Sequence, residues 1–395
     1  MVTITAEHKR CAAEIKMMQD KLQVIRERSS ADANLSTWFI GLPNIVFLYI
    51  FIRSYSLIYS SCMNVLPSTV TKVAQDQAIS PRKTEIQTRR MLSGHFGKIY
   101  SIAWAQNSIC LCSAAQDGKL ILWNCQDNIK LHSISLRSSW VMSCGYSPDG
   151  RLVSSGGLDN IVTIHSLPEN VVNNQRADPK LDTTPRIKAE LNTHDGYISS
   201  CAFYGNDKII TSSGDSTCTL FDIETLHAQS TYVGHLQDVM SASFHGSTLI
   251  TGSIDTTVRL WDLRADGKSQ KAAMIFKAHE SDVNVVQFLR NGTSFMSGSD
   301  DSTCRLFDIR VGRQLNYYHN QKLLTSVHCL DVSSSGRYLF TAYETPDICV
   351  WDTLHATQVQ HLESIHESQL SSLRVSPDGK CLASASWDHR IKIYA

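Results

Sequence analysis

The sequence predicts an all-β fold, a seven-bladed β-propeller at residues 87–395, preceded by an N-terminal coiled-coil α-helix at residues 1–30. Three observations support this prediction. A unit of about forty residues recurs seven times, which is the sequence signature of a repeat architecture. Each unit contains short stretches of period two separated by Gly, Asp, Asn and Ser turns, as strands require. Near the amino terminus, apolar residues instead follow heptad spacing.

The predicted helix rests on a seam of apolar or small residues that are four, three, four and three positions apart: Cys11, Ile15, Met18, Leu22 and Ile25. This spacing places all five on one face of a helix. The seam covers only about three heptads, and an isolated helix of that length is marginal in water. We therefore expect a partner helix to cover the seam; the alternative is that the helix lies on its own propeller.

Residues 31–86 are predicted to be a linker that contains an atypical apolar insertion at about 37–68. The run from Trp38 to Ile52 is almost entirely apolar. A membrane-spanning helix needs about 20 such residues, and extending the run to Tyr59 brings in a charged arginine. Three interpretations remain open: an insertion, including the translation of an unremoved intron; an interfacial or partner-binding segment; and a membrane span.

The seven repeat units are recognised by segments that begin with Ser or Thr and end on an aromatic residue or His. These segments are SAAQDGKLILW (113–123), SGGLDNIVTIH (155–165), TSSGDSTCTLF (211–221), TGSIDTTVRLW (251–261), SGSDDSTCRLF (297–307), TAYETPDICVW (341–351) and SASWDHRIKIY (384–394). Six carry Asp at the fifth position, and a His precedes five of the units, as in Gly94-His95. Trp-Asp is literal at 261–262 and 351–352. These features in phase are typical of the WD40 repeat and predict a seven-bladed WD40 propeller.

In such blades the turn Asp, the loop His, the strand Ser or Thr and the Trp are expected to form a buried hydrogen-bond chain. The candidate positions are His95, Ser113, Asp117, Trp123, Thr211, Asp215, His235, Thr251, Asp255, Trp261, Ser297, Asp301, Ser384 and Asp388. Ser, His and Asp also make hydrolase triads, but a trio that recurs in unit after unit is structural rather than catalytic. Residues 87–93 (QTRRMLS) are expected to close the ring, because closure removes the exposed edges of the terminal blades.

Composition and the absence of known motifs exclude several classes of function. Lys plus Arg and Asp plus Glu number 37 each, and the zero net charge argues against nucleic-acid binding by bulk charge. Cys110 and Cys112 would share one face of a strand, so we predict buried hydrophobic residues rather than zinc ligands. Phosphate-binding, dinucleotide-binding, nucleophile-elbow and zinc-protease motifs are absent from the sequence. We expect a non-enzymatic protein without cofactor or metal, in a reducing, intracellular compartment because the charged start is unlike a secretory signal.

Several longer stretches are more specific than the repeat itself. They include TRRMLSGHFGKIYSIAW (88–104), LRSSWVMSC (136–144), GHLQDVMS (234–241) and GSDDSTCRLFD (298–308). With these stretches and its N-terminal helix, the chain resembles a heterotrimeric G-protein β subunit. The resemblance covers residues 1–36 and about 69–395.

The resemblance implies a non-catalytic component of a signalling switch. Its partners would be an obligate prenylated γ subunit (Gγ), which pairs with the N-terminal helix, and a GDP-bound α subunit (Gα), which binds one face of the propeller. When α takes up GTP, the βγ unit would be freed to engage effectors, under the control of receptors. The expected location is the cytoplasmic face of the plasma membrane, reached mainly through the γ prenyl group, and the cytoplasm.

The resemblance also assigns residues to the face that binds α and effectors. By motif position these are Lys98, Tyr100, Lys119, Ile121, Lys130, Trp140, Met142, Leu158, Asn160, Tyr197, Asp238, Met240, Asp282, Asn284, Asp300 and Trp387. Aromatic and Met anchors with Lys and Asp around them suit a protein contact. Some have a plainer alternative: Trp140 as a core strand residue, Ile121 and Leu158 as strand packing, and Lys130 as a solvated turn lysine.

The chain departs from the family pattern at two places that bear on function. The sixth unit has Glu344-Thr345 where an Asp pair is usual and lacks the upstream His, so its hydrogen-bond chain should be incomplete. Gln369 replaces a family Arg in the seventh unit, which removes a positive contact. The alternative function is a WD40 scaffold unrelated to heterotrimeric G proteins, tethered to a membrane through residues 38–59.

Overall fold

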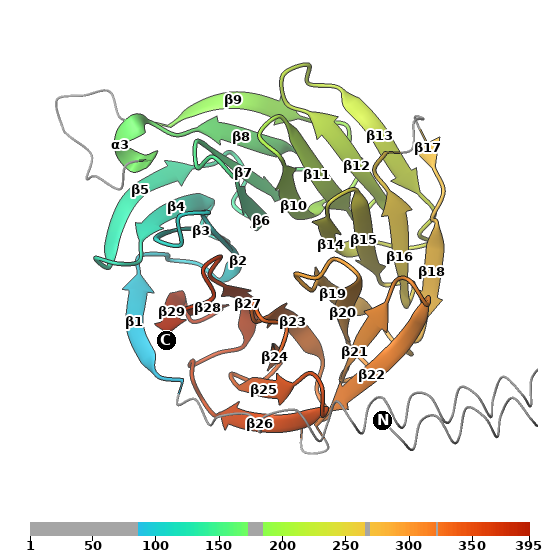
Figure 1. The fold of residues 1–395 in the computed structure, drawn as a ribbon. Helices are drawn as coiled ribbons and strands as arrows, with labels where there is room; N and C mark the ends of the chain where they lie inside the picture. Colours follow the sequence, from blue (N-terminus) through green and yellow to red (C-terminus); the bar gives the residue numbers. More distant parts are fainter. Residues whose placement is uncertain (1–85, 173–184, 265–268, 321–322) are drawn as a thin grey trace, which may run out of the picture. The chain divides into compact units, whose positions relative to one another are not determined.

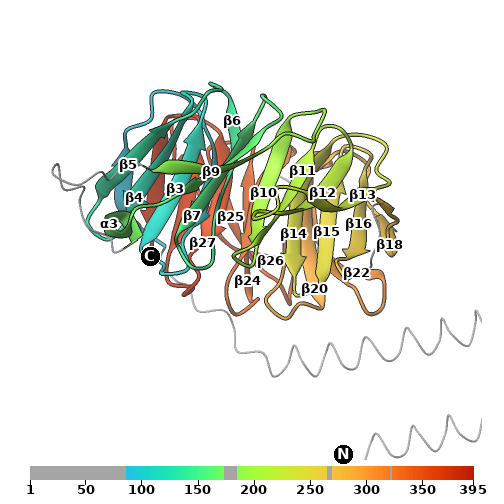
Figure 2. The same ribbon diagram turned by 90° about the horizontal axis from the view of Figure 1, so that it is seen from above.

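The structure, a computed structural model, describes residues 86–172, 185–264, 269–320 and 323–395. These residues form seven antiparallel sheets arranged as the blades of a ring (Figure 1), which Figure 2 shows from the side. The predicted seven-bladed propeller is therefore confirmed. The predicted N-terminal helix, with its seam from Cys11 to Ile25, and the apolar insertion lie outside the described residues.

The blades are numbered here along the chain. Blade one contains β2 (Ile99–Trp104), β3 (Cys110–Ala115), β4 (Lys119–Asn124) and β5 (Ile129–Ser135). Blade two contains β6 (Val141–Tyr146), β7 (Leu152–Gly157), β8 (Val162–Ser166) and β9 (Arg186–Leu191), with the short helix α3 (Glu169–Val172) between the last two. Blade three contains β10 (Ile198–Tyr204), β11 (Lys208–Ser213), β12 (Thr217–Asp222) and β13 (Ala228–Val233), with β17 (Ser269–Gln270) added in parallel at its edge.

Blade four contains β14 (Val239–His245), β15 (Thr248–Ser253), β16 (Thr257–Asp262) and β18 (Met274–Lys277). Blade five contains β19 (Val283–Phe288), β20 (Ser294–Ser299), β21 (Thr303–Asp308) and β22 (Arg313–His319). Blade six contains β23 (Val327–Val332), β24 (Tyr338–Tyr343), β25 (Ile348–Asp352) and β26 (Thr357–Leu362). Blade seven contains β27 (Leu370–Val375), β28 (Leu382–Ser386), β29 (Arg390–Tyr394) and β1 (Thr88–Ser93).

Ring closure comes from the segment that precedes the first repeat. β1 pairs antiparallel with β29, so that Leu92 lies opposite Ile391 and Ser93 opposite Arg390. The last blade is thus completed by a strand from the other end of the propeller (Figure 1). The prediction that residues 87–93 close the ring is confirmed. Without β1, the edge of β29 would be unpaired, so closure covers the exposed edge of the last blade.

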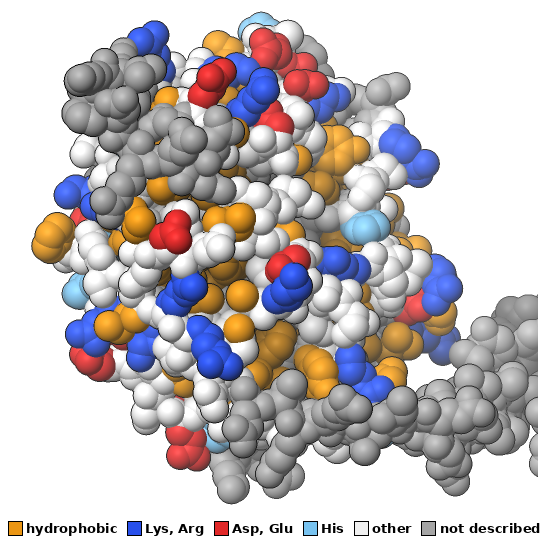
Figure 3. Space-filling model, turned by 60° about the vertical axis from the view of Figure 1, so that its left-hand side comes forward, with side chains coloured by type: hydrophobic (Ala, Val, Ile, Leu, Met, Phe, Trp, Pro, Cys, Tyr) orange, Lys and Arg blue, Asp and Glu red, His pale blue; other side chains and the backbone are white. Residues whose placement is uncertain are grey.

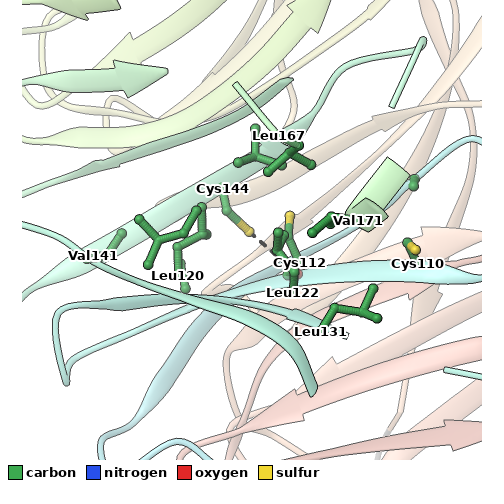
Figure 4. Packing of buried hydrophobic residues seen from close by; sticks show 13 residues of the cluster. Cys110, Cys112, Leu120, Leu122, Leu131, Val141, Cys144, Leu167 and Val171 are labelled. Atoms are coloured by element: carbon green, nitrogen blue, oxygen red, sulfur yellow. Dashed lines mark hydrogen bonds between the residues drawn. The ribbon is translucent and has the colours of Figure 1, made fainter. Parts of the chain in front are cut away.

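The core lies between neighbouring blades rather than at the centre of the ring. Figure 4 shows one such cluster, where Cys112 and Leu122 of blade one face Cys144 of blade two. Strand residues two apart point to the same side, so Cys110 and Cys112 both enter this cluster. Both cysteines are buried, as their predicted packing role requires. The motif therefore serves hydrophobic contact between blades.

A buried hydrogen-bond chain ties the turns of blade one to its strands. His95 Nδ1 lies 3.0 Å from Asp117 Oδ2, and His95 Nε2 lies 2.7 Å from Ser113 Oγ. Trp123 Nε1 donates to the same hydroxyl oxygen at 2.8 Å. An ionised Asp accepts from Nδ1–H, which leaves Nε2 to accept from the hydroxyl. Every polar atom of the chain then has a partner, as burial demands.

The same chain recurs around the ring with a different last member. In blade four, His235 bridges Asp255 and Thr251 at 2.8 and 2.7 Å, and Trp261 donates to Thr251 at 2.9 Å. The equivalent trios in blades three, five and seven are His194, Thr211 and Asp215; His279, Ser297 and Asp301; and His366, Ser384 and Asp388. Their last members are Phe221, Phe307 and Tyr394, of which only the tyrosine hydroxyl joins the chain. We call each His–Asp–hydroxyl trio a blade lock.

Two blades lack the lock. In blade six Leu323 stands at the lock His position and Thr345 at the Asp position, so its chain is reduced to the 3.0 Å bond from Trp351 Nε1 to Thr341 Oγ1. The predicted incompleteness is therefore present. Blade two keeps Asp159 but has Arg137 at the His position, and among the described residues His165 Nδ1 is buried without a hydrogen-bond partner.

The locks hold their carboxyl groups ionised. Burial alone would raise the pKa of Asp388, but the hydrogen bond from His366 and two backbone N–H groups lower it to about 2. For Asp215 burial likewise acts to raise the pKa, and the bonds from His194 and Thr217 bring it to about 2. Burial lowers the pKa of His235, which favours the neutral imidazole that the chain requires.

We expect Asp255→Ala to destabilise the propeller by about 1–3 kcal/mol, because it leaves the buried His235 ring and the Leu236 N–H unpaired. Asp262→Ala is the matched control in the same blade, since that carboxylate is exposed and contacts Arg264. It should cost no more than about 0.5 kcal/mol. Urea unfolding of both variants measures the difference, and equal losses would contradict the structural role of the lock.

The low pKa of the lock aspartates predicts loss of stability in acid. An unfolded Asp titrates near pH 3.9, so between about pH 4 and pH 2 the unfolded state binds protons that the folded state excludes. The contribution of Asp388, about 2 kcal/mol, is complete above pH 4 and is lost as the pH falls through its folded pKa of about 2. Melting temperatures across this range should decline less steeply for Asp388→Asn than for the wild type. If the melting temperatures of the two proteins fell in parallel with pH, the pKa of Asp388 would not be lowered in the folded state.

Candidate protein-binding face

Most of the residues assigned to partner contact lie at one end of the blades. Some stand at the start of an innermost strand, as Lys98 and Trp140 do before β2 and β6. Others stand in the turn after the second strand, as Leu158 does after β7 and Trp387 after β28. An antiparallel strand ends where its neighbour begins, so both groups share one end of the ring. We call this end the turn face.

An aromatic cluster with a lysine forms one part of the turn face. The ring centroid of Tyr100 lies 6.2 Å from that of Trp140, stacked, and 6.2 Å from that of Trp387, edge-on. Lys98 Nζ lies 3.8 Å from the centre of the Trp387 ring, within cation–π range. Trp140 is 41% exposed, so the cluster offers apolar area to solvent. Trp387 as a whole is half-buried, but its Nε1 atom is buried and has no hydrogen-bond partner among the described residues.

Carboxylates and hydrogen-bonded polar groups form another part of the turn face. Tyr197 donates its hydroxyl to Asp238 Oδ2 at 3.0 Å and lies 3.5 Å from Met240 Sδ. Burial, and then the neighbouring Asp238, raise the pKa of Tyr197 to about 12, so the phenol stays protonated. These contacts fix the rotamers of a half-buried trio before any partner arrives, which reduces the entropy lost on binding.

The acidic pair of blade five is held by an asparagine. Asn284 Nδ2 donates to Asp300 Oδ1 at 2.5 Å and to the Val327 carbonyl of blade six at 3.0 Å. Burial, and then the charge of Asp300, raise the pKa of Asp282. Asp282 and Asp300 therefore repel one another at this end of the blade, and a cationic partner group would relieve that repulsion.

The remaining assigned residues divide into those on the turn face and those elsewhere. Lys119, Met142, Leu158 and Asn160 are exposed or half-buried at the same ends of β4, β6 and β8. Leu158 is 49% exposed, so neither it nor Trp140 is a core strand residue. Gln369, at the family Arg position, accepts the Trp387 N–H with its backbone carbonyl at 3.1 Å.

Two assigned residues do not lie on the turn face as expected. Ile121 is 0% exposed inside β4, in the cluster between blades one and seven, so its side chain is strand packing and is not available to a partner. Lys130 lies on the rim strand β5 opposite Trp123, at the far end of β4 from Lys119, and is a strand lysine rather than a turn lysine. Burial, and then the charge of Lys119, lower the pKa of Lys130. The Lys130 ammonium group therefore interacts electrostatically with Lys119 of the turn face.

Two exposed apolar residues of the turn face were not among the predicted contact residues. Phe96 and Leu236 are 82% and 83% exposed, and each directly follows the His of a lock. Their backbone N–H groups donate to Asp117 and Asp255, at 3.0 and 3.1 Å, which turns the side chains outward. The signal was in the repeat: the position after each loop His is held by the lock and faces solvent.

The surface chemistry suits protein contact. On the side of the molecule that Figure 3 shows, basic, acidic and apolar side chains are interspersed rather than gathered by sign. The lock trios have the distances of a hydrolase triad, but Ser113 is completely buried, so no substrate reaches it. No group of three or more His, Cys, Asp or Glu among the described residues is placed to hold a metal. Nor is any described helix long and apolar enough to cross a membrane.

Comparisons with known proteins agree on one family. A family model described as "G protein beta WD-40 repeat protein" matches residues 59–395. A "Guanine nucleotide-binding protein subunit beta" of Solanum tuberosum is 41% identical over 352 residues, covering 84% of this chain and 90% of the relative. Relatives named in the same way from Nicotiana tabacum and Zea mays are 40% and 39% identical over the same length, with 84% of this chain covered and 91% and 90% of the relatives.

Proposed function

The chain belongs to the G protein β WD40-repeat family, and from that premise we propose that it is the β subunit of a heterotrimeric G protein. In this function it pairs with a prenylated γ subunit, holds the GDP-bound α subunit on the turn face, and engages effectors after α takes up GTP. It acts by binding, without chemistry of its own. The observation that carries the proposal is the cluster of Lys98, Tyr100, Trp140 and Trp387 on that face.

The cluster has the composition of an interface anchor. Trp and Tyr side chains packed together at the centre of an interface are among the residues that contribute most of the binding free energy in protein complexes. The acidic groups at Asp238, Asp282 and Asp300 would add register and specificity against a basic partner surface. The family match favours this function over the alternative of an unrelated WD40 scaffold tethered through residues 38–59.

Release of α is explained by a higher affinity of the turn face for GDP-bound α than for GTP-bound α. The locks hold five of the seven blades rigid, so the simplest switch is a change in α that removes its complementarity to the turn face. The freed face then becomes available to effectors, and receptors act by promoting the exchange on α. We propose that γ provides the membrane contact, which places the complex at the cytoplasmic side of the plasma membrane.

Trp387→Ala should weaken binding of GDP-bound α by about 30-fold, which corresponds to a hot-spot loss of about 2 kcal/mol. Lys98→Ala, which removes the cation over the Trp387 ring, should weaken binding less. Calorimetric titration with α-GDP measures both, with thermal melting to show that stability is retained. Val311→Ala is the control, because Val311 is exposed in the turn between β21 and β22, at the other end of the blade. Unchanged α binding by Trp387→Ala would place the α site elsewhere.

Pairing with γ should depend on the heptad seam. Replacing Ile15 and Leu22 together by Asn removes two knobs from a seam of about three heptads and should abolish co-purification of a γ chain. Asp20→Ser with Gln23→Ser changes two residues off the seam and is the matched control. Wild-type recovery of γ with the seam variant would mean that the helix packs elsewhere. Since the propeller is untouched, its melting temperature should be the same in both variants.

A further inference from the structure

Blade six lacks the lock at its turn-face end, as blade two does. Leu323 and Thr345 stand where the locked blades have His and Asp. Among the described residues, the hydroxyls of Thr325 and Thr345 are buried there without hydrogen-bond partners. A buried polar group without a partner lowers the free energy needed to open the structure around it.

The turn of blade six also differs in its backbone. In the other blades the residue after the turn Asp has a left-handed backbone, with φ of 65° at Ser216, 61° at Ser302 and 68° at His389. Blade six has Pro346 at this position, and the proline ring excludes such a conformation. The turn keeps the backbone bond from Glu344 N to the Ser326 carbonyl, at 2.9 Å, and is otherwise held from the outer strand, where Ile365 N donates to the Pro346 carbonyl at 3.1 Å and Ser364 N to Asp347 Oδ1 at 2.7 Å.

The opposite end of blade six is held by a buried carboxylate. Asp331, near the end of β23, accepts the Val375 N–H of blade seven at 2.7 Å and the Val332 N–H at 2.8 Å. Burial raises the pKa of Asp331, and the charge of Arg374 opposes that rise. Replacing this carboxylate would therefore leave a buried N–H donor and a half-buried cation less satisfied.

Two arginines extend this contact across the neighbouring blades. Arg374 of blade seven donates to Gln287 Oε1 of blade five at 3.5 Å, and Arg290, in the turn between β19 and β20 of blade five, donates to the Pro377 carbonyl after β27. Both arginines favour the charged form of Asp331. Blades five and seven are thus bridged around the strand that carries Asp331, at the end of the ring away from the turn face.

We infer that blade six is a hinged unit, fixed at one end by Asp331 with Arg290 and Arg374, and opening first at the turn face because it has no lock. Opening separates the Val327 carbonyl from Asn284, which also holds Asp300. The blade therefore controls how the acidic pair of the turn face is presented. This inference rests on the contacts within the ring and stands whether or not the turn face binds an α subunit.

The chain contains matched reporters for this opening. Cys218, Cys304 and Cys349 are the second residues of the third strands of blades three, five and six, near the turn-face end, and all three are buried free thiols. Cys218 lies in the cluster between the locked blades three and four, whereas Cys304 and Cys349 share the cluster between blades five and six. The full-length protein is alkylated with iodoacetamide under native conditions. Labelling of each cysteine is followed by mass spectrometry and divided by its rate in the denatured chain.

In the wild-type protein Cys349 should label at least about tenfold faster than Cys218, and Cys304, which packs against blade six, should label at a rate between the two. Asp331→Asn should raise the Cys349 rate by a further factor of about ten while leaving Cys218 unchanged. Asp215→Ala, which breaks the lock of blade three, should do the reverse and raise Cys218 alone. Gln287→Ala, which removes only an acceptor of Arg374, is a milder variant that should raise Cys349 less than Asp331→Asn.

Two results would overturn the inference. Equal wild-type rates for the three cysteines would show that blade six opens no more readily than the locked blades. Equal acceleration of all three in both Asp331→Asn and Gln287→Ala would show that Asp331 stabilises the whole ring rather than one blade. The wild-type comparison needs no variant, and Gln287→Ala tests the Asp331 end if Asp331→Asn does not fold.

Discussion

The structure depends on the requirement that a buried polar group must have a partner. Each lock satisfies this requirement by passing one hydrogen-bond chain from a turn carboxylate through an imidazole to a strand hydroxyl. Because the chain joins a loop, a turn and two strands, it fixes the relative positions of elements that are about twenty residues apart. Five blades use this device, and the apolar contacts between blades complete the ring.

The locks also position the surface above them. The carboxylate of each lock accepts the N–H of the residue after the His, so that Phe96 and Leu236 point outward. Trp387 immediately precedes the lock residue Asp388, which places its ring at the turn face beside Lys98. A stability device and a binding surface thus share the same turns. Substitutions in the lock would be expected to disturb both, whereas substitutions of the outward side chains would disturb only binding.

Blades two and six depart from the repeat because neither has the lock. Blade six replaces the lock by contacts at its other end, and blade two replaces the lock histidine by Arg137, which pairs with Glu190. Both blades keep the strand pairing of their neighbours. The repeat architecture accepts such changes because each blade contacts mainly the two beside it, so a local loss of stability need not spread around the ring.

The sequence by itself determined the number of blades, the closing strand, the lock positions and most of the turn face. These follow from residues that recur at fixed spacing, and the two-residue period of a strand fixes which side each residue faces. Only the tertiary structure showed that Ile121 is enclosed between blades and that Lys130 lies on the rim strand. It also brought Tyr100, Trp140 and Trp387 together, and Asp331 beside Val375. Those outcomes depend on packing between blades, where residues far apart in sequence meet at distances that no repeat spacing encodes.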